Sequence, residues 1–292
     1  MSQSHTGKVA FITGANRGIG FDTAQGLARL GIHVVLGARD RSQGDAAAAR
    51  IRAEGGSAEA IVFDAAVSAS HQAAYEVIAA RHGKLDILVN NAGVASEALL
   101  GGNHTSSVSS EVLHTTFEVN FFGVVATTKA AMPHLRASRG RVVTVTSVGG
   151  VVGQPFNEAY CAAKFAVEGF MESLAPVAAT VGVLVSVVEP GPVATEFVNN
   201  VGVDVAAMFA AAGDYEPAMH AYMAHIMAEF ANPDAAQTGD DVADVVLTAM
   251  VTDSPAFRHQ TSHWSRTFTG YKLSDHDGSA VVGMTTDWLR AD

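Results

Sequence analysis

A glycine-rich turn lies between an apolar strand and a helix near the start of the chain. Residues 8–13 predict a buried strand, and residues 19–30 predict a helix. The turn reads Thr13-Gly14-Ala15-Asn16-Arg17-Gly18-Ile19-Gly20, with the glycines spaced Gly-x-x-x-Gly-x-Gly. Glycine permits a tight turn and lets backbone N–H groups approach a pyrophosphate at a helix N-terminus. The turn therefore predicts an α/β fold that binds a dinucleotide through Gly14, Asn16, Arg17, Gly18, Ile19 and Gly20.

Apolar runs and helical stretches alternate along the first two thirds of the chain. The strands are continuous apolar runs, which is typical of strands buried on both faces. Alternation at this spacing predicts a doubly wound parallel sheet with right-handed crossovers. Further strands are predicted at residues 33–37, 58–63, 85–90, 141–146 and 183–188. Further helices are predicted at residues 43–54, 68–82, 109–135, 157–181 and 240–250.

The pattern indicates a single domain, residues 1–292, because no linker or repeat interrupts it. Its α/β core spans residues 8–190. Residues 195–233 carry helical patterning after the sixth strand, at the sheet edge where open α/β sheets bind ligands. They predict a substrate-binding insertion. Residues 255–292 form a tail with many polar residues and a weak strand signal.

Composition excludes several classes of protein. A formal net charge of −11 argues against nucleic acid as a partner, which requires a basic surface. The single cysteine, Cys161, excludes an intramolecular disulfide and fits a reducing compartment. The first eight residues contain no apolar stretch typical of a signal peptide. No run approaches the ~20 apolar residues that span a bilayer, so we expect a cytoplasmic protein without a membrane span.

Two arginines indicate which dinucleotide is bound. A site for NAD places an acidic residue after the second strand to bind the ribose hydroxyls. This chain has Arg39 there, followed by Asp40, and Arg17 lies in the glycine turn. Arginine suits a phosphate through its planar fork of donors. Solvated surface arginines are the alternative, but both residues fall at predicted contact points, which favours NADP(H).

Two further segments fall at the same predicted sheet edge. Asp64 follows the third strand, where a carboxylate can accept a hydrogen bond from the adenine amino group. A turn or helix-cap aspartate is the alternative reading. Asn90-Asn91-Ala92-Gly93 ends the fourth strand. We expect Asn91, Ala92 and Gly93 to line the adenosine.

Tyr160 and Lys164 lie four residues apart in a predicted helix, so both side chains project from one face. A tyrosine pKa near 10 is too high for a base at neutral pH, but a neighbouring ammonium group lowers it. Ser147 ends the fifth strand and could bind the substrate oxygen as charge develops on it. Asn120 could hold a water that relays protons from Lys164.

These motifs, with Pro190-Gly191-Pro192-Val193-x-Thr195, occur in the order typical of the short-chain dehydrogenase/reductase family, which the chain resembles over residues 8–200. The resemblance implies a Rossmann fold and a catalytic tetrad of Asn120, Ser147, Tyr160 and Lys164. Tyr160 and Lys164 would also contact the cofactor. It implies further cofactor contacts from Pro190, Gly191, Val193 and Thr195. Ala163 departs from the serine that many members carry there.

A narrower resemblance covers residues 147–198 and points to the hydroxysteroid and retinol dehydrogenases of that family. It implies NADP(H), a 17β-hydroxysteroid (estradiol or estrone) as substrate, and a homodimer or homotetramer. Ser147 and Tyr160 would bind the reacting oxygen. Tyr222-Met-Ala-His225 and Asp287 would bind the distal steroid oxygen.

Several alternatives stay open. The substrate could be another lipophilic carbonyl compound, such as retinal, a polyketide or an acyl thioester, and a non-catalytic NADP(H)-binding sensor is a candidate of another class. Met219, Met223 and Met227 repeat every four residues, which fits either a ligand-contacting face or core packing. No metal site is predicted, because the twelve histidines show no ligand spacing.

Overall fold

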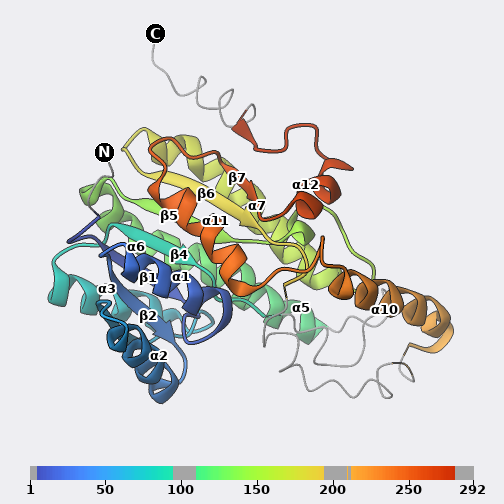
Figure 1. Ribbon diagram of the computed structural model, residues 1–292, viewed down its shortest axis with the longest axis horizontal. Helices are drawn as coiled ribbons and strands as arrows, with labels where there is room; N and C mark the ends of the chain where they lie inside the picture. Colours follow the sequence, from blue (N-terminus) through green and yellow to red (C-terminus); the bar gives the residue numbers. More distant parts are fainter. Residues whose placement is uncertain (1–4, 95–109, 194–208, 210–211, 280–292) are drawn as a thin grey trace, which may run out of the picture.

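Seven parallel strands form the centre of the fold (Figure 1). The computed structural model describes residues 5–94, 110–193, 209 and 212–279. The sheet order is β3-β2-β1-β4-β5-β6-β7. The strands after β1 are therefore added first on one side of it and then, from β4 onward, on the other. The strands are β1 (Val9–Thr13), β2 (His33–Ala38), β3 (Ala58–Val62), β4 (Ile87–Asn90), β5 (Arg141–Val145), β6 (Leu184–Glu189) and β7 (Arg258–Gln260).

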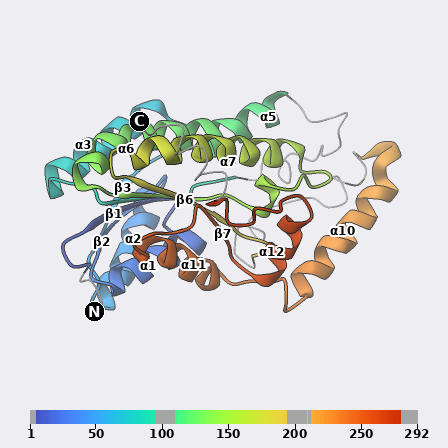
Figure 2. The ribbon, with the colours of Figure 1, turned by 90° about the horizontal axis from the view of Figure 1, so that it is seen from above.

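Helices cover both faces of this sheet (Figure 2). One face carries α1 (Gly18–Arg29), α2 (Arg41–Ala53) and α11 (Gly239–Val251). The other carries α3 (Ser68–His82), α5 (Ser110–Phe117), α6 (Gly123–Ser138) and α7 (Glu158–Ala179). Each layer has its own apolar core, and strand residues alternate between the two cores: Ile12 packs on one side and Phe11 on the other. Strands enclosed in this way explain the continuous apolar runs of the sequence.

The predicted doubly wound parallel sheet is confirmed, with small shifts at element ends. Helix α2 begins at Arg41, two residues earlier than predicted, because Asp40 caps it by accepting a hydrogen bond from Gln43 N. The predicted helix 109–135 is three elements instead of one. A π-helix, η1 (Glu118–Phe122), separates α5 from α6. Helix α6 continues past Pro133 to Ser138.

The tail contributes more structure than its weak strand signal indicated. Strand β7 extends the sheet beyond β6, and α12 (His263–Gly270) follows it. Two short 3-10 turns, η2 (Val148–Gly150) and η3 (Gly213–Tyr215), complete the described elements. Among the described residues, none of the helices combines the length and apolarity needed to cross a bilayer.

Helix α10 (Glu216–Ala231) lies apart from the two layers, at one end of the molecule (Figures 1 and 2). It is the longest described element of the predicted insertion, residues 195–233. Met219 packs with Ala212 in a small cluster that also includes Phe156, Phe209 and Met223. Phe156 precedes α7, so this cluster joins α10 to the segment that leads into α7.

Candidate active site

The glycine turn takes a conformation that only glycine adopts without strain. Gly14 and Gly18 have φ of 65° and 53°, in the left-handed region. A Cβ on Gly20 would collide with the Asn91 amide and lie 2.5 Å from Gly14 O. Helix α1 begins at Gly18, and its N-cap residue Arg17 gives no side-chain cap. The first-turn N–H groups of α1 are therefore left for an anion, so the turn fits a pyrophosphate.

Asn91 holds this turn against the end of β4. Its Nδ2 donates to Thr13 O at 3.0 Å and to Gly14 O at 3.1 Å. Thr13 Oγ1 in turn accepts hydrogen bonds from Asn91 N and Ala92 N, each at 3.0 Å. The sequence predicts Asn91 as part of the adenosine lining, and the structure adds that its side chain is committed to shaping the turn.

The environment of Arg39 favours a phosphate over a hydroxyl partner. Arg39 is exposed directly after β2, and Arg17 is exposed in the glycine turn. The neighbouring carboxylate of Asp40 accepts from Gln43 N at 2.8 Å and Ser42 Oγ at 2.9 Å, and these bonds lower its pKa. Asp40 is thus engaged in capping α2. Asn16 Nδ2 donates to Gln43 Oε1 at 2.9 Å, which ties the turn to α2.

Asp64 lies after β3, in a turn of its own making. Its Oδ1 accepts a hydrogen bond from Ala66 N at 3.0 Å, and its backbone N–H donates to Ser70 Oγ at 2.9 Å. This is the turn geometry that the sequence left as an alternative. The contact between Asp64 and the adenine amino group stays a prediction, and it would use the second carboxylate oxygen.

Lys164 is a buried ammonium group close to Tyr160. It is 6% exposed, and its Nζ donates to Val145 O at 3.2 Å. Nζ lies 5.7 Å from the centre of the Tyr160 ring. Burial lowers the pKa of Lys164 to about 8, and Glu168 one turn further along α7 acts in the opposite direction. The charge that would stabilise a Tyr160 phenolate is therefore present at neutral pH.

Ser147 and Tyr160 meet around Gly149. Ser147 Oγ accepts a hydrogen bond from Gly149 N at 3.0 Å. A Cβ on Gly149 would lie 3.3 Å from Ser147 Oγ and 3.4 Å from Tyr160 Cε1. The absence of a side chain at Gly149 therefore allows the two hydroxyl-bearing residues to approach one another at the end of β5.

Asn120 completes the cluster from the π-helix η1. Its Oδ1 accepts from Val94 N at 2.8 Å, and its Nδ2 donates to Val94 O at 2.7 Å. Asn120 Oδ1 and Lys164 Nζ lie 3.3 Å and 3.7 Å from the position that a Cβ on Gly93 would take. The four predicted tetrad residues thus converge on one site. Asn120 fixes the backbone after β4, and the water relay stays a prediction.

The predicted cofactor contacts Pro190, Gly191 and Val193 follow β6 at the same edge. Pro190 O accepts a hydrogen bond from Val148 N at 3.0 Å, which joins it to the turn after Ser147. A Cβ on Gly191 would lie 2.8 Å from Ser265 Oγ, so glycine lets α12 approach closely. Val193 pairs with Gln237 as an isolated bridge. Thr195 and Asp287 lie outside the described residues.

The predicted substrate residues on α10 differ in their placement. Tyr222 is half-buried, with its ring 5.6 Å from the Phe156 ring, and burial raises its pKa to about 12. His225 is exposed, about 120° of helix rotation from the buried Met219. The structure therefore does not bring His225 to the tetrad, and the role of His225 in substrate binding stays a prediction. Met219 is core, whereas Met227 is 65% exposed, so the methionine repeat serves no single role.

A buried ion-pair network behind the tetrad was missed by sequence reasoning. Arg258 on β7 lies within 3.5 Å of three carboxylates, those of Glu168, Glu172 and Glu189. Glu168 could have been found, because it lies four residues after Lys164 on the same helix. Arg258 gave no signal, since it lies in the polar tail.

A family model supplies the deciding comparison. The model of the short chain dehydrogenase family matches residues 8–206. The chain belongs to the short-chain dehydrogenase/reductase family. This oxidoreductase family uses NAD(H) or NADP(H) as its hydride carrier.

Individual relatives agree with this membership. The short-chain dehydrogenase/reductase is 35% identical over 282 residues to human 17-beta-hydroxysteroid dehydrogenase type 1, a match covering 94% of this chain and 83% of the relative. It is 34% identical over 201 residues to human dehydrogenase/reductase SDR family member 7, covering 67% of this chain and only 58% of that relative. A metagenomic short-chain oxidoreductase solved in complex with NADP is 29% identical, with a TM-score of 0.69 over 88% of this chain and 98% of that one.

Proposed function

We propose that this short-chain dehydrogenase/reductase is an NADP(H)-dependent enzyme that transfers a hydride between the cofactor and the carbon of a secondary alcohol or ketone. The observation that carries the proposal is the convergence of Ser147, Tyr160 and the buried ammonium group of Lys164 at the carboxyl edge of the sheet. A protein that only binds NADP(H) has no need of this arrangement.

The side chains divide the acid–base work between them. Ser147 Oγ donates to the substrate oxygen and holds it next to Tyr160. Tyr160 Oη takes the hydroxyl proton when an alcohol is oxidised and returns it when a ketone is reduced. Lys164 stabilises the phenolate, because a positive charge nearby lowers a tyrosine pKa. General acid–base catalysis of this kind contributes about 10²- to 10⁴-fold.

NADP(H) suits the residues of the nucleotide end. When bound, the cofactor would donate the hydride in ketone reduction and accept it in alcohol oxidation. The glycine turn and the uncapped start of α1 would hold its pyrophosphate, with Arg17 and Arg39 against the 2′-phosphate. Asp40 caps α2 through its Oδ1, so it already serves the fold at this position. The NADP complex of the 29% identical oxidoreductase supports the same assignment.

A 17β-hydroxysteroid such as estradiol or estrone is the proposed substrate. Support comes from the 35% identity to 17-beta-hydroxysteroid dehydrogenase type 1 across 94% of this chain. Support also comes from Tyr222, Met219 and Met223, which place an apolar face of α10 next to Phe156 and the start of the catalytic helix. Retinal, a polyketide or an acyl thioester would suit the same apolar face.

One assay separates these substrates from one another and from the sensor hypothesis. Purified protein is mixed with NADPH or NADP⁺ and a panel of a steroid, a retinoid and an acyl thioester, and cofactor absorbance is followed. We expect turnover of estradiol or estrone that falls by orders of magnitude in Tyr160→Phe, with NADPH binding retained. Turnover of another panel member alone would replace the steroid. NADPH binding without any turnover would favour the sensor.

A homodimer or homotetramer in the cytoplasm is also proposed. Phe122 of η1 and Val177 of α7 lie on the same helical layer and are 52% and 54% exposed, and contact between subunits would remove these side chains from water. Sedimentation equilibrium tests this directly: a monomer at all concentrations would contradict it.

A further inference from the structure

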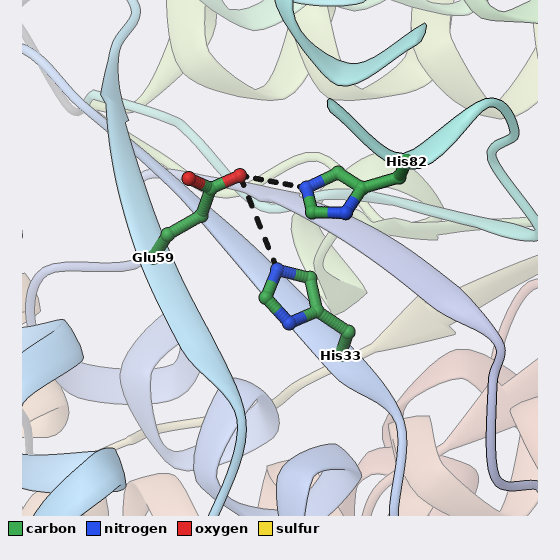
Figure 3. Close-up of side chains that lie close together, drawn as sticks. All are labelled: His33, Glu59 and His82. Atoms are coloured by element: carbon green, nitrogen blue, oxygen red, sulfur yellow. Dashed lines mark hydrogen bonds and ion pairs between the residues drawn. The ribbon is translucent and has the colours of Figure 1, made fainter. Parts of the chain in front are cut away.

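Three side chains of metal-ligand type meet at the amino end of the sheet, far along the strands from the tetrad. His33 is the first residue of β2, Glu59 is the second residue of β3, and His82 is the last residue of α3. Figure 3 shows the three side chains pointing toward one another. One nitrogen from each imidazole and one carboxylate oxygen all lie within 4.8 Å of each other.

Most polar atoms of this cluster have a hydrogen-bond partner, but His33 Nε2 has none among the described residues. Glu59 Oε1 lies 2.7 Å from His82 Nε2 and 3.9 Å from His33 Nε2, while Arg81 binds the other carboxylate oxygen. His33 Nε2 is shielded from solvent and has no hydrogen-bond partner among the described residues. His33 Nδ1 lies 2.7 Å from Ser57 Oγ. When Nδ1–H donates to Ser57, the lone pair of Nε2 is directed at Glu59, as second-shell partners direct metal-binding histidines.

We propose that His33, Glu59 and His82 form a site for a divalent transition metal, with Zn²⁺ as its preferred ion. Two imidazoles and one carboxylate are a ligand set that zinc takes with a water in the fourth position. Zinc–ligand bonds of about 2.0–2.2 Å in a tetrahedron place ligand atoms about 3.3 Å apart. The two nitrogen–oxygen separations of 2.7 Å and 3.9 Å bracket this value, and the two imidazole nitrogens lie within 4.8 Å of each other, so the rings must shift by about an ångström or more to ligate one ion.

Charge and exposure at the cluster suit such an ion. The side chains of His33, Glu59 and His82 are 24%, 25% and 19% exposed, so the cluster lies close to the protein surface. Imidazole ligands select zinc over magnesium and calcium, which prefer oxygen. Arg81 opposes binding, because it places a second cation beside Glu59.

The position of the site assigns it a structural role. The metal would link β2, β3 and α3, which all belong to the nucleotide-binding half, at the sheet edge opposite the glycine turn. It would stabilise the folded protein without touching the reacting atoms. The three residues are separated by more than twenty positions each, which is why the sequence shows no ligand spacing.

Zinc titration of the full chain tests the proposal. ZnCl₂ is added to metal-free protein at pH 7.5 and followed by calorimetry and by thermal unfolding, and CoCl₂ is used as a spectroscopic probe. We expect one equivalent to bind, the Tm to rise, and Co²⁺ to show the intense visible bands of tetrahedral coordination. His33→Ala, His82→Ala and Glu59→Gln should each weaken binding at least about tenfold.

Two further variants make the test specific. His220→Ala is the matched control, because His220 also pairs with a carboxylate, that of Glu216 at 3.6 Å, on the exposed face of another helix. It should bind zinc as the wild type does. Arg81→Ala removes the competing cation and should tighten binding. Any one of three results would overturn the assignment. These are no zinc binding by the wild type, wild-type zinc affinity in the three ligand variants, and an unchanged zinc affinity in Arg81→Ala.

Discussion

Replacing Arg258 with methionine should destabilise the enzyme strongly, and more so at alkaline pH. The guanidinium group is 9% exposed and lies 3.5 Å from Glu168, 3.3 Å from Glu172 and 3.3 Å from Glu189. Glu168 and Glu172 belong to α7, which carries Tyr160 and Lys164, and Glu189 ends β6. Methionine fills similar space without charge, so the variant removes the cation that these three carboxylates share.

The magnitude follows from the burial of those carboxylates. Glu168 is 5% exposed and Glu189 is fully buried, and removing one partner of such a buried pair costs about 3–5 kcal/mol. Burial raises the pKa of Glu168 to about 8 and raises that of Glu189, even with Arg258 present. A carboxyl group whose pKa is raised by folding contributes stability below its unfolded value, and that stability is lost as pH rises through the folded value. Loss of Arg258 raises both pKa values further. The loss in free energy of unfolding is therefore small near pH 5 and largest above about pH 8.

Urea unfolding followed by circular dichroism at pH 5.5 and pH 8.5 measures this difference. The matched control is Arg266→Met, because Arg266 is an exposed arginine on the neighbouring helix α12. We expect the control to change the free energy of unfolding by less than about 0.5 kcal/mol at both values. A loss in Arg258→Met that is equal at the two pH values, or under about 1 kcal/mol at pH 8.5, would refute the reasoning.

Three other predictions concern the cofactor and the base. Arg39→Ala should weaken NADPH binding at least about tenfold in a fluorescence titration and leave NADH little changed, since one charge-assisted hydrogen bond is worth about 1.5–3 kcal/mol; equal losses for both cofactors would contradict a 2′-phosphate contact. Asn91→Ala removes the two hydrogen bonds that hold the glycine turn, each worth about 1 kcal/mol, so both the Tm and the NADPH affinity should fall. A lower Tm with unchanged affinity would separate Asn91 from the nucleotide site. Lys164→Met removes the cation near Tyr160 and should shift the pH profile of alcohol oxidation to higher pH; an unshifted profile would exclude that role.

The fold could be predicted from the sequence because its signals are local. Each strand is an apolar run enclosed by helices, and each turn between them carries glycine or a polar cap such as Asp40. The exceptions have physical causes. A π-helix at residues 118–122 leaves the helical pattern of the sequence unchanged, so one long helix was expected. Strand β7 is only three residues long and begins with Arg258. A charged residue does not predict a buried strand, and Arg258 is buried here because it forms ion pairs with carboxylates of other elements.

The candidate site also contains some residues that a local pattern predicts and others that it does not. Tyr160 and Lys164 share one helix, so their spacing alone places them together. Asn91 and Arg258 act through partners on other elements, and no local pattern reveals such contacts. His33, Glu59 and His82 are the extreme case, since each comes from a different element.

The same contrast explains why the chemistry of this enzyme can be inferred more firmly than its substrate. Ten residues of α7 are buried, and they fix Tyr160 and Lys164 whatever compound is bound. Helix α10 has Met219 as its only buried residue, and the inward-facing Tyr222 and Met223 are partly exposed. Replacing an α10 side chain therefore costs the protein little stability but changes the surface offered to a ligand. A change of substrate through α10 would therefore leave the packing that holds Tyr160 and Lys164 intact.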